Sequence, residues 1–175
     1  MGRGVDVRGP PTFSRAYTGP MRYFPLAPMS GLIKGLTILM LALPASLLIE
    51  PLTRFVALGL GVMYLIVFLF TRPTGFEITP RTVVVVFPLW RREINGITNA
   101  RLTDSDNLKQ TYGRLLRVGV GGLWGGFGWL WSAKSWVEMY ISRTDGYVLL
   151  ERDGGIPLLI TPERSEEVVR MVGGG

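Results

Sequence analysis

Two pairs of carboxylates have the spacing that acid–base catalysis could use. Asp104 and Asp106 form one pair, and Glu166 and Glu167 form the other. General acid–base catalysis needs a carboxyl group whose pKa is shifted by burial or by a neighbouring charge. The first pair stands in a polar stretch and the second on an exposed face of an expected helix, so both are predicted to be solvated surface. We therefore expect no catalytic residue, and the protein is predicted not to be an enzyme.

Histidine and cysteine are both absent from the sequence. Haem ligation, most zinc and copper sites, histidine-based acid–base catalysis, thiolate chemistry and disulfides are therefore excluded for this chain alone. No metal and no cofactor is expected. The adjacent Arg91 and Arg92 could contact phosphate, but charge pairs of this kind more often protect an edge strand.

Glycine and aromatic residues dominate the segment 119–131, GVGGLWGGFGWLW, and no charged residue occurs between Arg117 and Lys134. The glycine spacing matches neither GxGxxG nor GxxxxGK[ST], so a phosphate-binding loop is not predicted. The rings have large apolar faces of the kind found at bilayer interfaces. Two interpretations stay open: a hairpin that covers the open side of a barrel, or a loop that docks on a membrane or a partner. The candidate docking residues are Trp124, Phe127, Trp129 and Trp131.

Two almost uncharged apolar runs, 32–49 and 55–70, are separated only by the sequence EPLTR. At about 1.5 Å of rise per residue, each helix would be about as long as a hydrocarbon core is thick. Because so short a connector forces the chain to turn back, residues 31–72 are predicted to form a two-helix transmembrane hairpin. The alternative is a buried hairpin in a soluble domain, which would need a larger core than 175 residues usually provide.

The excess of basic charge lies beside these runs. Residues 1–74 carry seven basic and two acidic side chains, whereas the remaining residues carry twelve and eleven. This distribution favours anionic lipid headgroups over nucleic acid as the partner. Four arginines precede the first run and one lies in the connector, so the positive-inside rule places both termini in the cytoplasm, with two spans in the cell membrane. The predicted headgroup contacts are Arg15, Arg22, Lys34, Arg54 and Arg72.

Residues 1–30 are rich in glycine, proline and arginine and show neither helical nor strand periodicity. They are predicted to form an extended N-terminal arm, which is either a disordered tail or a segment laid along a membrane or a partner. A cleavable signal peptide is not predicted, because its apolar stretch would follow a short basic region directly.

The pattern changes to β structure after residue 74, with β-branched and alternating runs separated by glycine-containing turns. The predicted strands cover residues 76–78, 82–87, 90–94, 97–102, 136–142, 147–151 and 156–160. A helix follows, with Thr161 as its N-cap and Pro162 in its first position. Residues 75–172 are therefore predicted to form one small antiparallel β-barrel closed by a C-terminal helix.

The sequences GGLWGGFGWLW, WVEMYIS and GYVLLERDGGIPLLITPERSEEVVRMV resemble the bacterial pleckstrin-homology-like (PH-like) domain family. In that family a GGLFGYFGxF-type loop precedes the late strands and a closing helix, and many members also carry an N-terminal two-helix membrane hairpin. The resemblance covers residues 75–172 and implies a PH-like β-barrel in a prokaryotic binding or scaffolding protein. This chain has Trp124 and Gly126 where large Phe and Tyr are typical. It has only Arg81 where phosphoinositide-binding relatives have a basic cluster, so specific inositol-lipid recognition is not expected.

Two functions are compatible with this membrane-anchored α+β organisation. The first is a non-catalytic scaffold or regulatory binding module at the cytoplasmic membrane face. The second is an accessory, supernumerary subunit of a larger membrane complex, such as a respiratory or transport assembly. The expected partners are membrane lipids together with a partner protein or further copies of the chain in a homo-oligomer, and no nucleic acid is expected.

Overall fold

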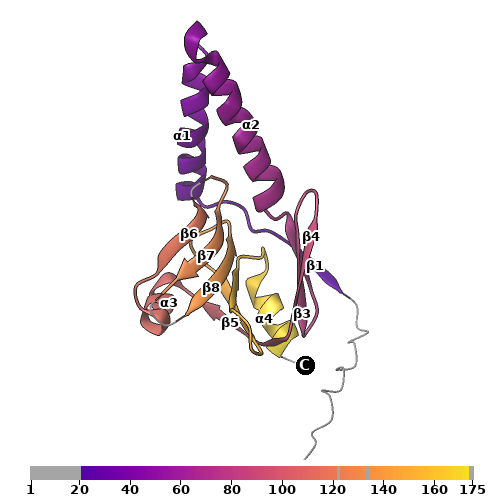
Figure 1. The fold of residues 1–175 in the computed structure, drawn as a ribbon. Coiled ribbons are helices and arrows are strands. Elements are labelled where there is room, and N and C mark those ends of the chain that lie inside the picture. The colour runs from indigo at the N-terminus through magenta and orange to yellow at the C-terminus, as the bar shows by residue number, and fades with distance from the viewer. Residues whose placement is uncertain (1–20, 122, 133–134, 174–175) are drawn as a thin grey trace, which may run out of the picture.

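The computed structural model describes residues 21–121, 123–132 and 135–173. Two apolar helices project from a domain that contains two sheets (Figure 1). The helix α1 spans Gly31–Leu47 and α2 spans Arg54–Thr71, and a short 3₁₀ turn, Pro51–Thr53, joins them. The N-terminal end of α1 and the C-terminal end of α2 meet the sheet domain, so the chain leaves and re-enters this domain on one side (Figure 1).

The predicted pair of transmembrane helices is wrong as a pair of spans. Within the described residues, one helical stretch, Pro51–Thr71, is long and apolar enough to cross a membrane, with a mean hydropathy of 2.1. The other helix, α1, has 17 residues, ends at Leu47 and is shorter than a span. Pro44 lies inside α1 and does not end it. What stands is one apolar helix with the length of a membrane span.

The first sheet has the order β1-β2-β3-β4 and is antiparallel throughout. Its strands are β1 (Arg22–Pro25), β2 (Gly75–Ile78), β3 (Thr82–Val86) and β4 (Arg91–Asn95). β1 lies in the segment predicted as an extended N-terminal arm. It pairs with β2, although both apolar helices separate the two strands in the sequence, and Phe24 faces Phe76. Phe24 is 1% exposed, so this short strand contributes to the core of the domain.

The second sheet has the order β5-β9-β10-β8-β7-β6. Its strands are β5 (Ile97–Thr103), β6 (Leu116–Gly121), β7 (Gly126–Trp131), β8 (Trp136–Ile141), β9 (Tyr147–Arg152) and β10 (Leu158–Ile160). The pairing of β10 with β8 is parallel, and the other pairings in this sheet are antiparallel.

The single PH-like barrel predicted from these strands is wrong, because they form two separate sheets. The chain changes sheet at Gly96, whose φ of +81° breaks the run between β4 and β5. The Gly96 carbonyl accepts a hydrogen bond from the Asp153 amide at 2.9 Å, and β5 then pairs with β9. Strand patterns identify strands but not their partners, so two sheets and one barrel have the same signature in sequence.

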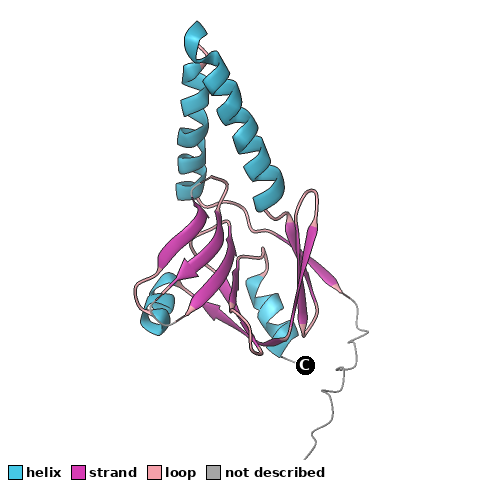
Figure 2. Cartoon of the chain, in the orientation of Figure 1, coloured by secondary structure: helices cyan, strands magenta, loops and turns pink. Residues whose placement is uncertain are grey.

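The central strands of the second sheet, β8, β9 and β10, contribute side chains to a core on each face of the sheet. Figure 2 shows the helices and the first sheet that lie against it. One face packs on the first sheet and on the C-terminal helix α4, Ser165–Gly173, in the larger core. The other face forms a smaller core under α3, Ser105–Tyr112, through Leu108, Met139 and Leu149. Strands β8 and β9 are therefore almost continuously apolar, as expected for strands covered on both sides.

The two short helices differ from expectation at their first turns. α3 occupies a polar stretch in which no helix was predicted, and Asp104 caps it by accepting hydrogen bonds from the amides of Asp106 and Asn107 at 3.0 and 2.7 Å. α4 begins at Ser165 and not at Pro162, because Pro162 forms an isolated β-bridge with Leu26.

Candidate functional site

The β6–β7 turn contacts both apolar helices where they meet the sheet domain. The Trp124 indole packs edge-on against the Phe68 ring of α2, with 4.9 Å between ring centroids. The backbone amide of Trp124 donates a hydrogen bond to Thr37 Oγ1 of α1 at 2.9 Å. This turn therefore holds the two helices together at their base. We refer to Thr37, Phe68, Arg72, Trp90 and Trp124 as the collar.

The backbone of Trp124 is strained in this position. Its φ is +58°, and it is the one non-glycine residue with positive φ among the described residues. A side chain in this left-handed region costs about 1–3 kcal/mol and persists only where the surroundings enforce it. The contact with Phe68 and the hydrogen bond to Thr37 are the interactions that enforce it here.

The β3–β4 turn forms the second contact with α2. Trp90 Nε1 donates a hydrogen bond to the Phe70 carbonyl at 3.1 Å, and the Trp90 ring stacks on Phe87 at 4.2 Å. Trp90 is 40% exposed and the neighbouring Leu89 is 60% exposed. Since tryptophan favours the interface between water and hydrocarbon, this turn has the composition of a membrane-contacting tip.

Three of the five predicted headgroup cations, Lys34, Arg54 and Arg72, lie at the ends of the helix pair. Lys34, in the first turn of α1, and Arg72, which follows α2, lie at the base, and the Arg72 guanidinium lies 5.3 Å from the centroid of the Phe68 ring. Arg54 begins α2 at the tip and donates a hydrogen bond to the Leu48 carbonyl. Arg22 pairs with Glu167 of α4, and Arg15 lies outside the described residues.

The segment that leads into α1 is attached to the sheet domain. The Ala27 amide donates to the Thr161 carbonyl at 3.0 Å, and the Ser30 amide donates to the Ser142 carbonyl at 3.2 Å. The Ser142 hydroxyl, fully buried, donates in turn to the Ala27 carbonyl. Together with the collar contacts, these hydrogen bonds fix the direction in which the helix pair leaves the domain.

The four aromatic residues predicted to dock are in three different environments. Phe127 is 3% exposed in the larger core, and Trp124 is partly buried against α2. Trp129 and Trp131 are 42% and 43% exposed. The ring centroids of Trp131 and the equally exposed Trp136 lie 6.5 Å apart. Register places Leu116 and Val118 of β6 beside these rings, and both are exposed. We refer to the patch formed by Leu116, Val118, Trp129, Trp131 and Trp136 as the tryptophan face.

A buried charge cluster was not found by sequence reasoning. Arg92 of β4 lies 2.6 Å from the Glu138 carboxylate of β8, and the Tyr140 hydroxyl donates to the same carboxylate at 2.6 Å. Burial and the hydrogen bond with Glu138 raise the pKa of Tyr140 well above its usual range. The signal was an acid inside an otherwise apolar strand, WVEMYI, which requires a cation from elsewhere in the fold. The cluster joins the two sheets.

The carboxylate pairs lie on the surface in ordinary polar contacts. Asp104 caps α3, and Asp106 is paired with Lys109 at 3.2 Å. Glu167 binds Arg22 and Arg164. Among the described residues, no group of acids has a geometry that could hold a metal ion.

No known family model, no curated protein and no solved structure matches this chain. The resemblance to the PH-like family therefore stays a prediction from the quoted motifs.

Proposed function

We propose that the protein is a non-catalytic binding module attached to a cell membrane through α2. The observation that carries this proposal is the exposure of the helix pair: only 6% of the apolar stretch of α2 is buried, so most of its apolar side chains have no protein cover. A helix that is apolar on all sides needs a hydrocarbon environment. The residues at least half exposed include Leu32, Ile38, Leu39 and Leu43 of α1 and Phe55, Leu58, Leu65 and Phe70 of α2.

Charge supports the cytoplasmic face as the location of the sheet domain. Lys34 and Arg72 lie at the base of the helix pair, whereas the tip carries Glu50 and Arg54, whose formal charges cancel. Cations accumulate on the cytoplasmic side of membrane helices. The sheet domain, which follows the base of α2, would then lie on the cytoplasmic side.

The collar supports a fixed orientation of the domain on the membrane. Trp90 and Trp124 bind the base of the pair from two different turns, and both are ring types that favour the interfacial layer. The sheet domain would therefore be held against the headgroups at a defined angle, as a scaffold or regulatory module requires.

Cysteine labelling tests this proposal cleanly, because the chain has no cysteine. Leu52→Cys marks the tip, and Asp145→Cys marks an exposed turn of the sheet domain. In membrane vesicles of known sidedness, a membrane-impermeant maleimide should label Asp145→Cys only from the cytoplasmic side and Leu52→Cys only from the other side. Labelling of both from one side, or release of the intact chain by carbonate, would refute the proposal.

The second candidate, an accessory subunit of a membrane complex, is favoured by the tryptophan face. Three tryptophans more than two-fifths exposed on adjacent strands form the kind of apolar patch that marks protein interfaces. Purification from native membranes in mild detergent distinguishes the two candidates. An accessory subunit co-purifies with unrelated chains in fixed stoichiometry, whereas a self-contained module purifies alone or as a homo-oligomer.

A further inference from the structure

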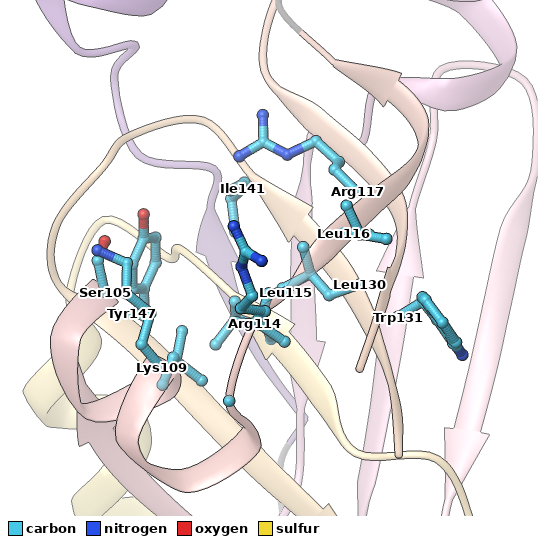
Figure 3. A pocket seen from close by; sticks show the side chains of 13 residues that line it. Ser105, Lys109, Arg114, Leu115, Leu116, Arg117, Leu130, Trp131, Ile141 and Tyr147 are labelled. Atoms are coloured by element: carbon cyan, nitrogen blue, oxygen red, sulfur yellow. The ribbon is translucent and has the colours of Figure 1, made fainter. Parts of the chain in front are cut away.

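A pocket of about 1160 Å³ lies between α3, β6 and the outer face of the second sheet (Figure 3). Its walls are mainly aliphatic and come from both α3 and the sheet. Leu108, Leu130, Ile141 and Leu159 are also buried residues of the smaller core, and Leu115 packs against it. Small-molecule pockets usually enclose about 300–1,000 Å³ and have apolar walls with a few polar groups. This pocket is somewhat larger than that range and has a mainly apolar lining, and it shares Leu116 and Trp131 with the tryptophan face.

The charged side chains that line the pocket are all cations: Lys109, Arg114 and Arg117. Lys109 is paired with Asp106, but Arg114 and Arg117 have no ion-pair partner among the described residues. Figure 3 shows the Arg114 guanidinium between Tyr147 and Leu116, with that of Arg117 farther along the same space. Two unpaired guanidinium groups above an aliphatic wall are complementary to an anion that carries an apolar chain.

Arg117 is directed toward the membrane-proximal end of the domain. Its side chain runs along β6 over Gly121 and Gly126, and Nη1 lies 3.5 Å from the position that a Cβ would take at either glycine. These glycines flank the turn that contacts α1 through Trp124. The absence of side chains at both positions leaves room for the guanidinium on the side from which a lipid would enter.

We infer that this pocket binds the anion of a single-chain membrane lipid, a long-chain fatty acid whose carboxylate contacts Arg114 and Arg117. The aliphatic wall takes the acyl chain, and the two arginines take the headgroup in bidentate contacts. The proximity of Arg117 to the base of α1 argues for the bilayer as the source of the ligand. The bilayer as the source of the ligand depends on the proposed membrane attachment. The binding of the carboxylate and the acyl chain in the pocket does not depend on it.

A photoactivatable diazirine fatty acid tests the inference with the full chain in phosphatidylcholine nanodiscs. After irradiation, proteolysis and mass spectrometry should locate the label in residues 105–117 and, independently, on α2. The double variant Arg114→Gln/Arg117→Gln should reduce pocket labelling about tenfold or more, since a charge-assisted hydrogen bond contributes about 1.5–3 kcal/mol and 1.4 kcal/mol is tenfold. Labelling of α2 should be unchanged, which controls for partition of the probe into the bilayer.

Three further measurements decide the outcome. Arg101→Gln, an exposed arginine of β5 outside the pocket lining, should label like the wild type. The methyl ester of the probe should lose pocket labelling in the wild type, because it has no charge for the arginines.

Equal labelling by acid and ester, or equal labelling of the wild type and the double variant by the acid, would overturn the inference. Displacement of the acid by millimolar inorganic phosphate would also overturn it and assign the site to free phosphate. Loss of α2 labelling alone would count against the membrane proposal and not against the pocket.

Discussion

The guanidinium of Arg92 and the carboxylate of Glu138 lie 2.6 Å apart and join the two sheets. The Glu138 side chain is 4% exposed, whereas that of Arg92 is 40% exposed. A buried carboxylate left without its cation is strongly destabilising, more so than the intact pair is stabilising. The partnership therefore explains how strand β8 tolerates an acid in its centre.

Replacement of Arg92 should reduce the stability of the fold more than replacement of its neighbour Arg91. Removing one partner of a fully buried pair costs about 3–5 kcal/mol, and the partial exposure of Arg92 reduces the expected loss for Arg92→Leu to about 2–4 kcal/mol. Arg91 pairs with Glu77 at the surface, so Arg91→Leu should cost less than about 1 kcal/mol. Unfolding of both variants in nanodiscs, followed by tryptophan fluorescence, measures the difference. Equal losses would mean that the cluster does not hold the sheets together.

The raised pKa of Tyr140 predicts a loss of stability at alkaline pH. The folded state retains the phenol proton at a pH where an unfolded tyrosine, with a pKa of about 10, releases it. This contribution is complete below about pH 10 and decreases as the pH rises above it. Thermal unfolding between about pH 9 and 11 should therefore show a shallower decline for Tyr140→Phe than for the wild type. Tyr23→Phe, at an exposed position outside the cluster, should keep the wild-type slope; a parallel decline for Tyr140→Phe would contradict the assignment.

Two substitutions at Trp124 separate its ring contact from its backbone strain. Trp124→Ala and Trp124→Gly both remove the contact with Phe68, and both should increase hydrogen exchange in the β6–β7 turn. Glycine also relieves the left-handed conformation, so the Gly variant should be about 1 kcal/mol more stable than the Ala variant. Denaturation midpoints give this comparison. An Ala variant as stable as the Gly variant would show that φ carries no strain at this position.

The paired glycines of β6 and β7 are expected to be indispensable for close strand contact. Gly119 faces Gly128, and a Cβ on either would lie 3.0 Å or less from backbone atoms of the other strand. Gly128→Ala should cost about 1–3 kcal/mol from overpacking and about 1 kcal/mol more from its positive φ. Gly113→Ala also has positive φ but meets no atom within 4 Å, so it isolates the second contribution. Similar thermal shifts for the two variants would exclude the steric explanation.

Local patterns were sufficient to predict the strands with a β-branched or alternating signature. The run 82–87 was confirmed as β3, and 97–102 as most of β5. β1 has only four residues and no alternation, and its strand conformation comes from pairing with β2, which no local pattern encodes. The same limit applies to the partition into two sheets.

The site was less predictable than the fold, because its contacts join residues far apart in the chain. Trp124 was singled out by composition, but its contact with Phe68 depends on how the β6–β7 turn meets α2. The role of Arg92 could not be read from the sequence, because Arg91 and Arg92 are identical residues at adjacent positions. Only the fold pairs Arg92 with the buried Glu138 and Arg91 with Glu77. Arg114 and Arg117 gave no signal, since a pocket arises only once α3 covers the sheet.

The pairing of β1 with β2 makes the helix pair an insertion within a β-hairpin, and this has a consequence for biosynthesis. The Leu26 amide donates to the Thr74 carbonyl at 3.1 Å, so the two ends of the insertion are neighbours in the finished protein. On the ribosome, β1 emerges first and has no partner until the intervening segment has been translated, at about 5–20 residues per second. A chain whose helices are misplaced would keep these ends apart and leave Phe24 outside its core. Completion of the first sheet would thus depend on the correct placement of both ends of the helix pair.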